Sequence, residues 1–283
     1  MRGQPESVRG SSIGLARNGL LVRVLPPGLY AGRARMLVVR SAVASRSVWL
    51  AIVSGFFEPL FFLFALGRGL GGLVGTVPGP LGQPLSYAAF IAPGLLAASA
   101  MNGALYDATY GFFLKLKYAK FYDAVLATPL GPLDVALGEI GWALLRGGLY
   151  AGGFFLVLLA LGLILLPWAL LVLPTALFVS FAFAALGIAA TSFMRSWQDF
   201  DLVQLAVLPM FLFSATFFPL WVYPPVLQWV VRAFPLYHAV ALMRDLTTGA
   251  VGTALLGHAA YFVVMAAVGI IVATRRLRTL LLR

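Results

Sequence analysis

Long apolar stretches separated by short polar segments dominate this sequence from Val48 onward. Six of these stretches have the length of about 20 residues that an α-helix needs to cross the hydrocarbon core of a membrane. They cover residues 48–67, 87–106, 135–156, 170–193, 202–221 and 253–273. The pattern therefore predicts an all-α integral membrane protein with six transmembrane helices.

The polar segments between these spans predict further short helices. Residues 28–46 are expected to form a helix at the inner membrane surface, although its polar face is poorly defined. Residues 115–134 combine three lysines with the helix-capable run FYDAVLA, then a Thr-Pro and a Gly-Pro break, and Asp134 is expected to cap the next helix. Residues 222–248 predict two helices, Pro225 to Ala233 and Leu236 to Leu246, which are too short to span. We expect the last two to be re-entrant or interfacial on the outer side.

These segments divide the chain into three parts. Residues 1–47 are expected to form a cytoplasmic tail with the interfacial helix, residues 48–275 the six-span membrane domain, and residues 276–283 a basic cytoplasmic tail. The outer segment from Arg68 to Gln83 contains GRGLGG, which matches a dinucleotide-binding pattern only formally because a membrane span precedes it. We interpret it as a flexible glycine-rich turn.

Composition supports the membrane assignment and charge gives the orientation. The chain is 61% hydrophobic and 10% charged, whereas soluble domains have about 25% charged residues. Of its 20 Lys and Arg residues, 16 fall in segments that the predicted topology places on one side. This asymmetry predicts that both termini are cytoplasmic. Although the net charge is +11, its placement favours anionic lipid headgroups as the partner and argues against nucleic acid.

Three charged residues fall inside the predicted spans, where charge is costly unless it is paired or faces a polar cavity. Glu139 and Arg146 are seven residues apart and share a helix face, but they lie about 10 Å apart along the axis. Each is therefore expected to find a partner on another span. For Glu58, a helix-packing hydrogen bond and a direct transport role both remain open.

The sequence contains no convincing catalytic, metal or nucleotide site. The lysines at 115, 117 and 120 precede Leu, Tyr and Phe, so none fits a P-loop, which needs Ser or Thr there. His238 and His258 lack an accompanying carboxylate cluster, and there is no cysteine. We expect no metal or cofactor in this chain. A carrier that uses Glu58 and an ion gradient, and a lipid-processing membrane enzyme, remain alternatives.

Two long runs resemble the permease subunits of type-2 ABC exporters. They are FYDAVLATPLGPLDVALGEIGWALLR and DFDLVQLAVLPMFLFSATFFPLWVYPPVLQWVVRAFPLYHAVALMR. The resemblance covers roughly Phe56 to Gly249 and is strongest to the nodulation-factor (lipo-oligosaccharide) exporter permeases, which are related to polysaccharide and daunorubicin-type drug exporters.

The resemblance implies a half-transporter of a bacterial cytoplasmic membrane. It would work as a homodimer with two copies of an ABC ATPase, which would bind ATP and Mg, so the permease itself would not be an enzyme. Its substrate would be an amphiphile such as a lipid-linked oligosaccharide or glycolipid, with a hydrophobic drug as the alternative. The segment from Lys117 to Ala127 would be the coupling helix that contacts the ATPase.

These implications assign candidate roles to individual residues. The candidates for ATPase coupling are Lys117, Lys120, Phe121, Tyr122, Asp123 and Leu126. The candidates for the substrate path are the aromatic residues Phe211, Phe213, Phe217 and Phe218. Plain packing against lipid or a dimer partner is the alternative for these four.

Overall fold

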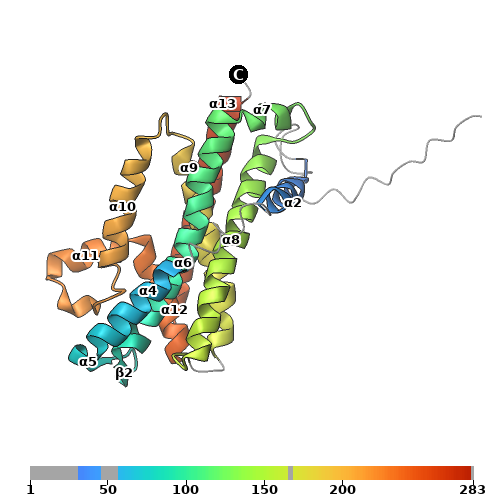
Figure 1. The fold of residues 1–283 in the computed structure, drawn as a ribbon. Helices are drawn as coiled ribbons and strands as arrows, with labels where there is room; N and C mark the ends of the chain where they lie inside the picture. Colours follow the sequence, from blue (N-terminus) through green and yellow to red (C-terminus); the bar gives the residue numbers. More distant parts are fainter. Residues whose placement is uncertain (1–30, 46–56, 165–167, 282–283) are drawn as a thin grey trace, which may run out of the picture.

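The computed structural model describes residues 31–45, 57–164 and 168–281. Its centre is a bundle of four helices (Figure 1), α6 (Tyr87–Tyr106), α8 (Pro132–Ala160), α9 (Val172–Thr191) and α13 (Ala254–Leu281). Five helical stretches of the described chain are long and apolar enough to cross a membrane, at 57–74, 87–118, 132–160, 172–191 and 254–280. The predicted all-α integral membrane protein is confirmed.

Small residues allow the bundle helices to approach closely. A Cβ atom added at Gly103 of α6 would lie 2.8 Å from the Gly147 Cα atom of α8, and one at Gly269 of α13 would lie 2.7 Å from the Ala185 carbonyl carbon of α9. Because lipid is as apolar as the helix surfaces, such close van der Waals packing is a main source of helix association in a membrane. Substitution at either glycine would push two helices apart.

The second span is longer than predicted. The sequence interpretation ended it at Tyr106, with Asp107 closing it, but the helix continues through two π-helical turns, η3 (Asp107–Gly111) and η4 (Leu114–Tyr118). The stretch of 32 residues from Tyr87 to Tyr118 is about 48 Å long at 1.5 Å per residue. The short helix α7 (Phe121–Leu126) follows directly, and α8 begins at Pro132.

The segment after the first span is ordered rather than a flexible turn. Helix α4 (Phe57–Phe62) continues into η2 (Leu63–Leu70) and α5 (Gly71–Val74), so GRGLGG is helical and that prediction was wrong. An antiparallel hairpin of β1 (Thr76–Pro78) and β2 (Pro84–Ser86) then leads into α6, with Val77 paired with Leu85. The predicted start of the first span, residues 48–56, lies outside the described residues, as does the segment of residues 1–30.

The fifth predicted span is only partly helical. Helix α10 (Asp199–Phe213) has 15 residues and ends well before the predicted end at Trp221. At about 22 Å it is shorter than the hydrocarbon core of about 30 Å. It stands to one side of the four-helix bundle (Figure 1) and follows the polar connection after α9.

Two short helices are present where the sequence predicted them. After the turn η6 (Leu220–Val222), α11 (Pro225–Ala233) and α12 (Pro235–Thr248) meet at an angle of 87°. The Arg244 guanidinium of α12 donates hydrogen bonds to the carbonyl oxygens of Phe90 (3.2 Å) and Ala215 (2.9 Å). Arg244 therefore ties the bent pair to α6 and to the non-helical chain after α10.

The N-terminal helix packs on α8 rather than standing free. Helix α2 (Ala34–Ala44) buries Leu37 and Ser41, and a Cβ atom at Gly138 would lie 2.7 Å from the Leu37 Cβ atom. At the other end of the chain, α9 follows the turn η5 (Trp168–Leu171) and α13 continues to Leu281. The described basic residues from Arg275 onward therefore continue the last helix.

Candidate functional site

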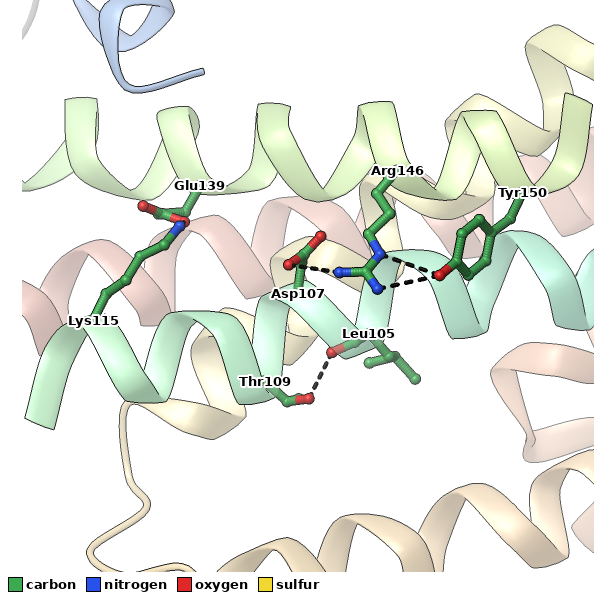
Figure 2. A network of polar contacts seen from close by, with 7 residues as sticks. All are labelled: Leu105, Asp107, Thr109, Lys115, Glu139, Arg146 and Tyr150. Atoms are coloured by element: carbon green, nitrogen blue, oxygen red, sulfur yellow. Dashed lines mark hydrogen bonds and ion pairs between the residues drawn. The ribbon is translucent and has the colours of Figure 1, made fainter. Parts of the chain in front are cut away.

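Two ion pairs join the extended second span to α8 (Figure 2). The Arg146 Nη1 atom lies 3.1 Å from Asp107 Oδ1, and the Lys115 Nζ atom lies 2.6 Å from Glu139 Oε2. The expectation that Glu139 and Arg146 each find a partner on another helix is confirmed. The side chains are between 3% and 23% exposed, so both pairs are largely shielded from solvent.

The Arg146 guanidinium also has aromatic neighbours. Its Nε and Nη2 atoms lie 3.3 Å and 3.1 Å from the Tyr150 hydroxyl, to which they donate hydrogen bonds, and its Cζ atom lies 4.5 Å from the centre of the Tyr106 ring. This set of partners surrounds the charge with hydrogen-bond acceptors and a π face, which offsets its desolvation. The pair is therefore a rigid connection between the two helices.

Sequence reasoning missed Asp107 and Lys115 as the partners. The two residues are eight apart on one helix, while Glu139 and Arg146 are seven apart on an antiparallel neighbour, so the two pairs fall in register. This matching of spacings was a usable signal. It was hidden because the second span was predicted to end at Asp107.

Tyr122 anchors the short helix α7 in the interior. Its side chain is 1% exposed, and its ring centre lies 5.4 Å from that of Phe112. Burial and, second, the nearby Glu139 carboxylate raise the pKa of the Tyr122 hydroxyl well above its ordinary value. The Tyr122 side chain thus faces α8 and not the surface where an ATPase contact was expected.

Helix α2 holds the coupling segment from its other side. The Arg40 Cζ atom lies 3.7 Å from the centre of the Phe121 ring. Asp134 of α8 fixes the start of α2: its carboxylate accepts hydrogen bonds from the backbone N–H groups of Ala31 (2.6 Å) and Arg33 (2.9 Å). Asp134 is the third residue of α8 and not the cap that was predicted, although it also accepts a bond from the Gly131 N–H at 3.0 Å.

The remaining coupling candidates lie at the end of the bundle where α7 is found (Figure 1). Lys117 and Lys120 are both exposed, in agreement with a role at a surface. Lys120 adopts a left-handed backbone conformation (φ 44°), which turns the chain sharply into α7. The side chains of Asp123 and Leu126 lie outside what the structure describes, so their roles stay predictions.

Glu58 lines a polar cavity and makes no helix-packing hydrogen bond with a described residue. The cavity, of about 230 Å³, lies between α4, α6 and α10, and its polar lining includes the side chains of Asn102 and Gln204. Among the described residues, none of these three side chains has a hydrogen-bond partner. This arrangement favours the alternative in which Glu58 faces a polar cavity.

The four aromatic candidates for the substrate path do not form one surface. Phe211 and Phe217 are buried and pack edge to face with ring centres 5.2 Å apart, together with Phe62. Phe213 and Phe218 are 40% and 53% exposed. Of the four, only Phe211 lines the polar cavity, and the role of all four in a substrate path stays a prediction.

A second cavity lies on the other side of α10. It has a volume of about 870 Å³ and is lined mainly by apolar residues of α9 and α10. Its lining also includes Arg195 and Asp199, from the connection into α10, and Phe234 and Pro235, from the junction of α11 and α12. The Asp199 carboxylate accepts backbone hydrogen bonds from Arg195 and Ser196, which lower its pKa.

The two histidines meet despite their separation in sequence. The Nδ1 atoms of His238 and His258 lie 2.7 Å apart, and the Tyr261 ring stacks on His238 with ring centres 4.1 Å apart. Within the described ranges no group of three His, Asp or Glu side chains is placed to hold a metal ion. The pair joins α12 to α13.

Comparison with known proteins places this arrangement in a family. Residues 33–247 match the ABC-2 type transporter family. The chain is 34% identical over 212 residues to nodulation protein J of Rhizobium leguminosarum bv. trifolii, covering 74% of this chain and 79% of that protein. It is 32% identical over 259 residues to nodulation protein J of Rhizobium leguminosarum bv. viciae, covering 90% and 98%. No solved structure gives a significant match.

The matched range begins in the segment before α2 and ends within α12, so it contains both ion pairs, the α7 segment and both cavities. It covers well over half of the 283 residues. The chain therefore belongs to the ABC-2 type transporter family.

Proposed function

We propose that this chain is the permease subunit of an ATP-driven exporter that moves an amphiphile outward across the cytoplasmic membrane of a bacterium. Membership of the ABC-2 type transporter family supports transport powered by a separate ATPase. The similarity to nodulation protein J, together with the resemblance of two long runs to the nodulation-factor (lipo-oligosaccharide) exporter permeases, supports a lipid-linked oligosaccharide or glycolipid as the substrate.

The proposed assembly contains two copies of this chain and two copies of an ABC ATPase. The ATPase would bind ATP and Mg, since none of the lysines in the central segment of this chain fits a P-loop. Both termini would lie on the cytoplasmic side, as the distribution of Lys and Arg predicts. The end of the bundle that carries α7 would then face the ATPase.

The attachment of α7 is the observation on which this proposal depends most. Tyr122 anchors α7 beside Glu139, and Arg40 holds Phe121 from the side of α2. A displacement of α7 by the ATPase would reach α8 through Glu139, and the extended second span through the bond from Glu139 to Lys115. Lys117 and Lys120 remain free to contact acidic groups of the ATPase.

Co-purification tests the proposal. A tagged chain purified in mild detergent from its native host is expected to bring down a P-loop ATPase, and Lys117→Glu with Lys120→Glu is expected to reduce its recovery. Arg68→Glu is the matched control, because Arg68 is also exposed but lies on η2, toward the hairpin end of the first described span. A chain that purifies without an ATPase would contradict the proposal, and so would an equal loss with the control variant.

A further inference from the structure

The polar cavity is lined by three side chains that can form hydrogen bonds but have no partner among the described residues. Glu58, Asn102 and Gln204 come from α4, α6 and α10, and all three line the same space of about 230 Å³. Asn102 is half-buried, while Glu58 and Gln204 keep exposed surface, and their polar groups converge from three helices on one space at membrane depth. A polar group at that depth is costly when lipid rather than a polar partner covers it, so the three together indicate a site for a polar ligand or for water.

The chemistry of this lining favours a neutral group rich in hydroxyls. The amides of Asn102 and Gln204 each donate and accept hydrogen bonds, whereas the Glu58 carboxylate accepts them when ionised. Tyr106 and Tyr110 add two phenol groups to the same lining. Among the described lining residues there is no Lys or Arg, so a phosphate beside an ionised Glu58 would find no cation there to offset the two charges. A saccharide supplies both donors and acceptors and matches this set.

The neighbouring apolar cavity has the size and lining for a hydrocarbon chain. Its volume of about 870 Å³ lies within the range of about 300–1,000 Å³ that is common for ligand sites. Leu105, Thr109, Val203 and Val207 line both cavities, so the polar and the apolar space adjoin across the contact between α6 and α10. One amphiphilic molecule can therefore occupy both.

We propose that the two cavities form one bipartite site, in which Glu58, Asn102 and Gln204 bind the saccharide head group while the cavity between α9 and α10 holds the acyl chain. The proposal rests on the exporter function inferred above and specifies where the substrate lies. Helix α10 separates the two halves of the site. Its Gln204 faces the polar cavity, and Ala206, two residues later, faces the apolar one.

Photolabelling of the complete chain together with its ATPase in lipid nanodiscs tests this assignment. The probe is a dodecyl disaccharide with a photoreactive diazirine at the end of the alkyl chain, and the comparison probe has the same chain with a phosphocholine head group. The disaccharide probe is expected to label peptides of α9 and α10. Asn102→Leu and Gln204→Leu are each expected to raise its half-saturating concentration at least about tenfold, and to leave the phosphocholine probe within about twofold.

The apolar half has its own variant and control. Ala206→Phe fills part of the cavity and is expected to weaken both probes at least about fivefold, since the obstructed space is used by the alkyl chain in each. Ala267→Phe is the matched control, because Ala267 is exposed on α13 and lines neither cavity. It is expected to leave both probes unchanged.

Several results would overturn the bipartite site. They are labelling confined to other helices, equal weakening of both probes by Gln204→Leu, and equal effects of Ala206→Phe and Ala267→Phe. A dodecyl trimethylammonium probe that loses affinity with Glu58→Gln, while the disaccharide probe does not, would show a cationic head-group site instead. Recovery of the ATPase in the same preparations is scored separately, so a failed site with a bound ATPase leaves the exporter function standing. If the expected labelling is found but no ATPase is recovered, the bipartite site stands and the exporter function fails.

Discussion

At the scale of single residues, the buried ion pair of Asp107 and Arg146 shows how this protein places charge at membrane depth. The side chains are 12% and 10% exposed, and the guanidinium also contacts Tyr150 and Tyr106. The attraction within such a pair offsets its desolvation only while both partners are present. Removing one partner therefore costs more than removing both.

Arg146→Met is expected to lower the free energy of unfolding by about 3–5 kcal/mol, because it leaves the Asp107 carboxylate buried without its cation. The double variant Asp107→Asn with Arg146→Met is expected to recover most of this loss. Thermal unfolding of the purified chain in detergent measures both, with Arg68→Met as the exposed control. If the double variant were as unstable as the single one, the pair would not be the source of the effect.

Arg244 is a second residue whose geometry predicts a measurable loss. It donates to two carbonyl oxygens, those of Phe90 and Ala215, and its guanidinium lies 4.0 Å from the centre of the Phe90 ring. Arg244→Lys keeps the charge but not the planar fork that reaches both acceptors. We expect a loss of about 1–3 kcal/mol in unfolding free energy, and equal stability of the lysine variant would count against this role.

At the scale of elements, the contact between α2 and α7 allows ATPase binding and coupling to be tested separately. The cation–π contact of Arg40 with Phe121 joins the two helices. Arg40→Ala is expected to leave ATPase recovery unchanged and to reduce the stimulation of ATP hydrolysis by substrate at least about twofold, since such contacts at exposed sites contribute about 0.5–1 kcal/mol. Arg35→Ala, on the same helix and also exposed, is the control. A loss of ATPase recovery with Arg40→Ala alone would assign Arg40 to the interface instead.

The sequence predicted most elements, and its errors have physical causes. Apolar length located α8, α9 and α13, and proline and aromatic spacing located α11 and α12. It ended the second span at Asp107 because a carboxylate is costly in a membrane, yet Arg146 on α8 compensates that cost. It extended the fifth span to Trp221 because the run stays apolar, although the helix ends at Phe213. Both errors concern tertiary partners, which periodicity along one chain does not encode.

The same limit explains which residues of the candidate site the sequence identified and which it missed. Glu58 was identified because a carboxylate in an apolar stretch is conspicuous, whereas Asn102 and Gln204 are uncharged amides and attracted no attention. Tyr122 was predicted to contact the ATPase because the resemblance implies a coupling helix there, but its ring packs on Phe112 in the interior. Composition identifies a single costly residue well. It does not show which cavity that residue faces or which residues share the cavity with it.

At the scale of the whole molecule, helix lengths and charge together require the hairpin β1–β2 and helix α7 to lie on opposite sides of the membrane. The helix between them, from Tyr87 to Tyr118, is about 48 Å long and exceeds the hydrocarbon core of about 30 Å. The positive-inside rule predicts that the basic end at Lys117 and Lys120 lies on the cytoplasmic side. The absence of cysteine from the sequence makes this arrangement directly measurable.

Single-cysteine variants with a membrane-impermeant maleimide are expected to divide into two groups. Leu81→Cys, in the exposed hairpin turn, should react in intact cells, because the hairpin leads into the outer end of α6. Lys120→Cys and Ser196→Cys should react only after the membrane is made permeable, because both lie at the end of the bundle that carries α7 and the connection between α9 and α10. Reaction of Leu81→Cys and Lys120→Cys from the same side would remove α7 from reach of a cytoplasmic ATPase or require the second span to turn back within the membrane. Either result would contradict the proposed coupling mechanism.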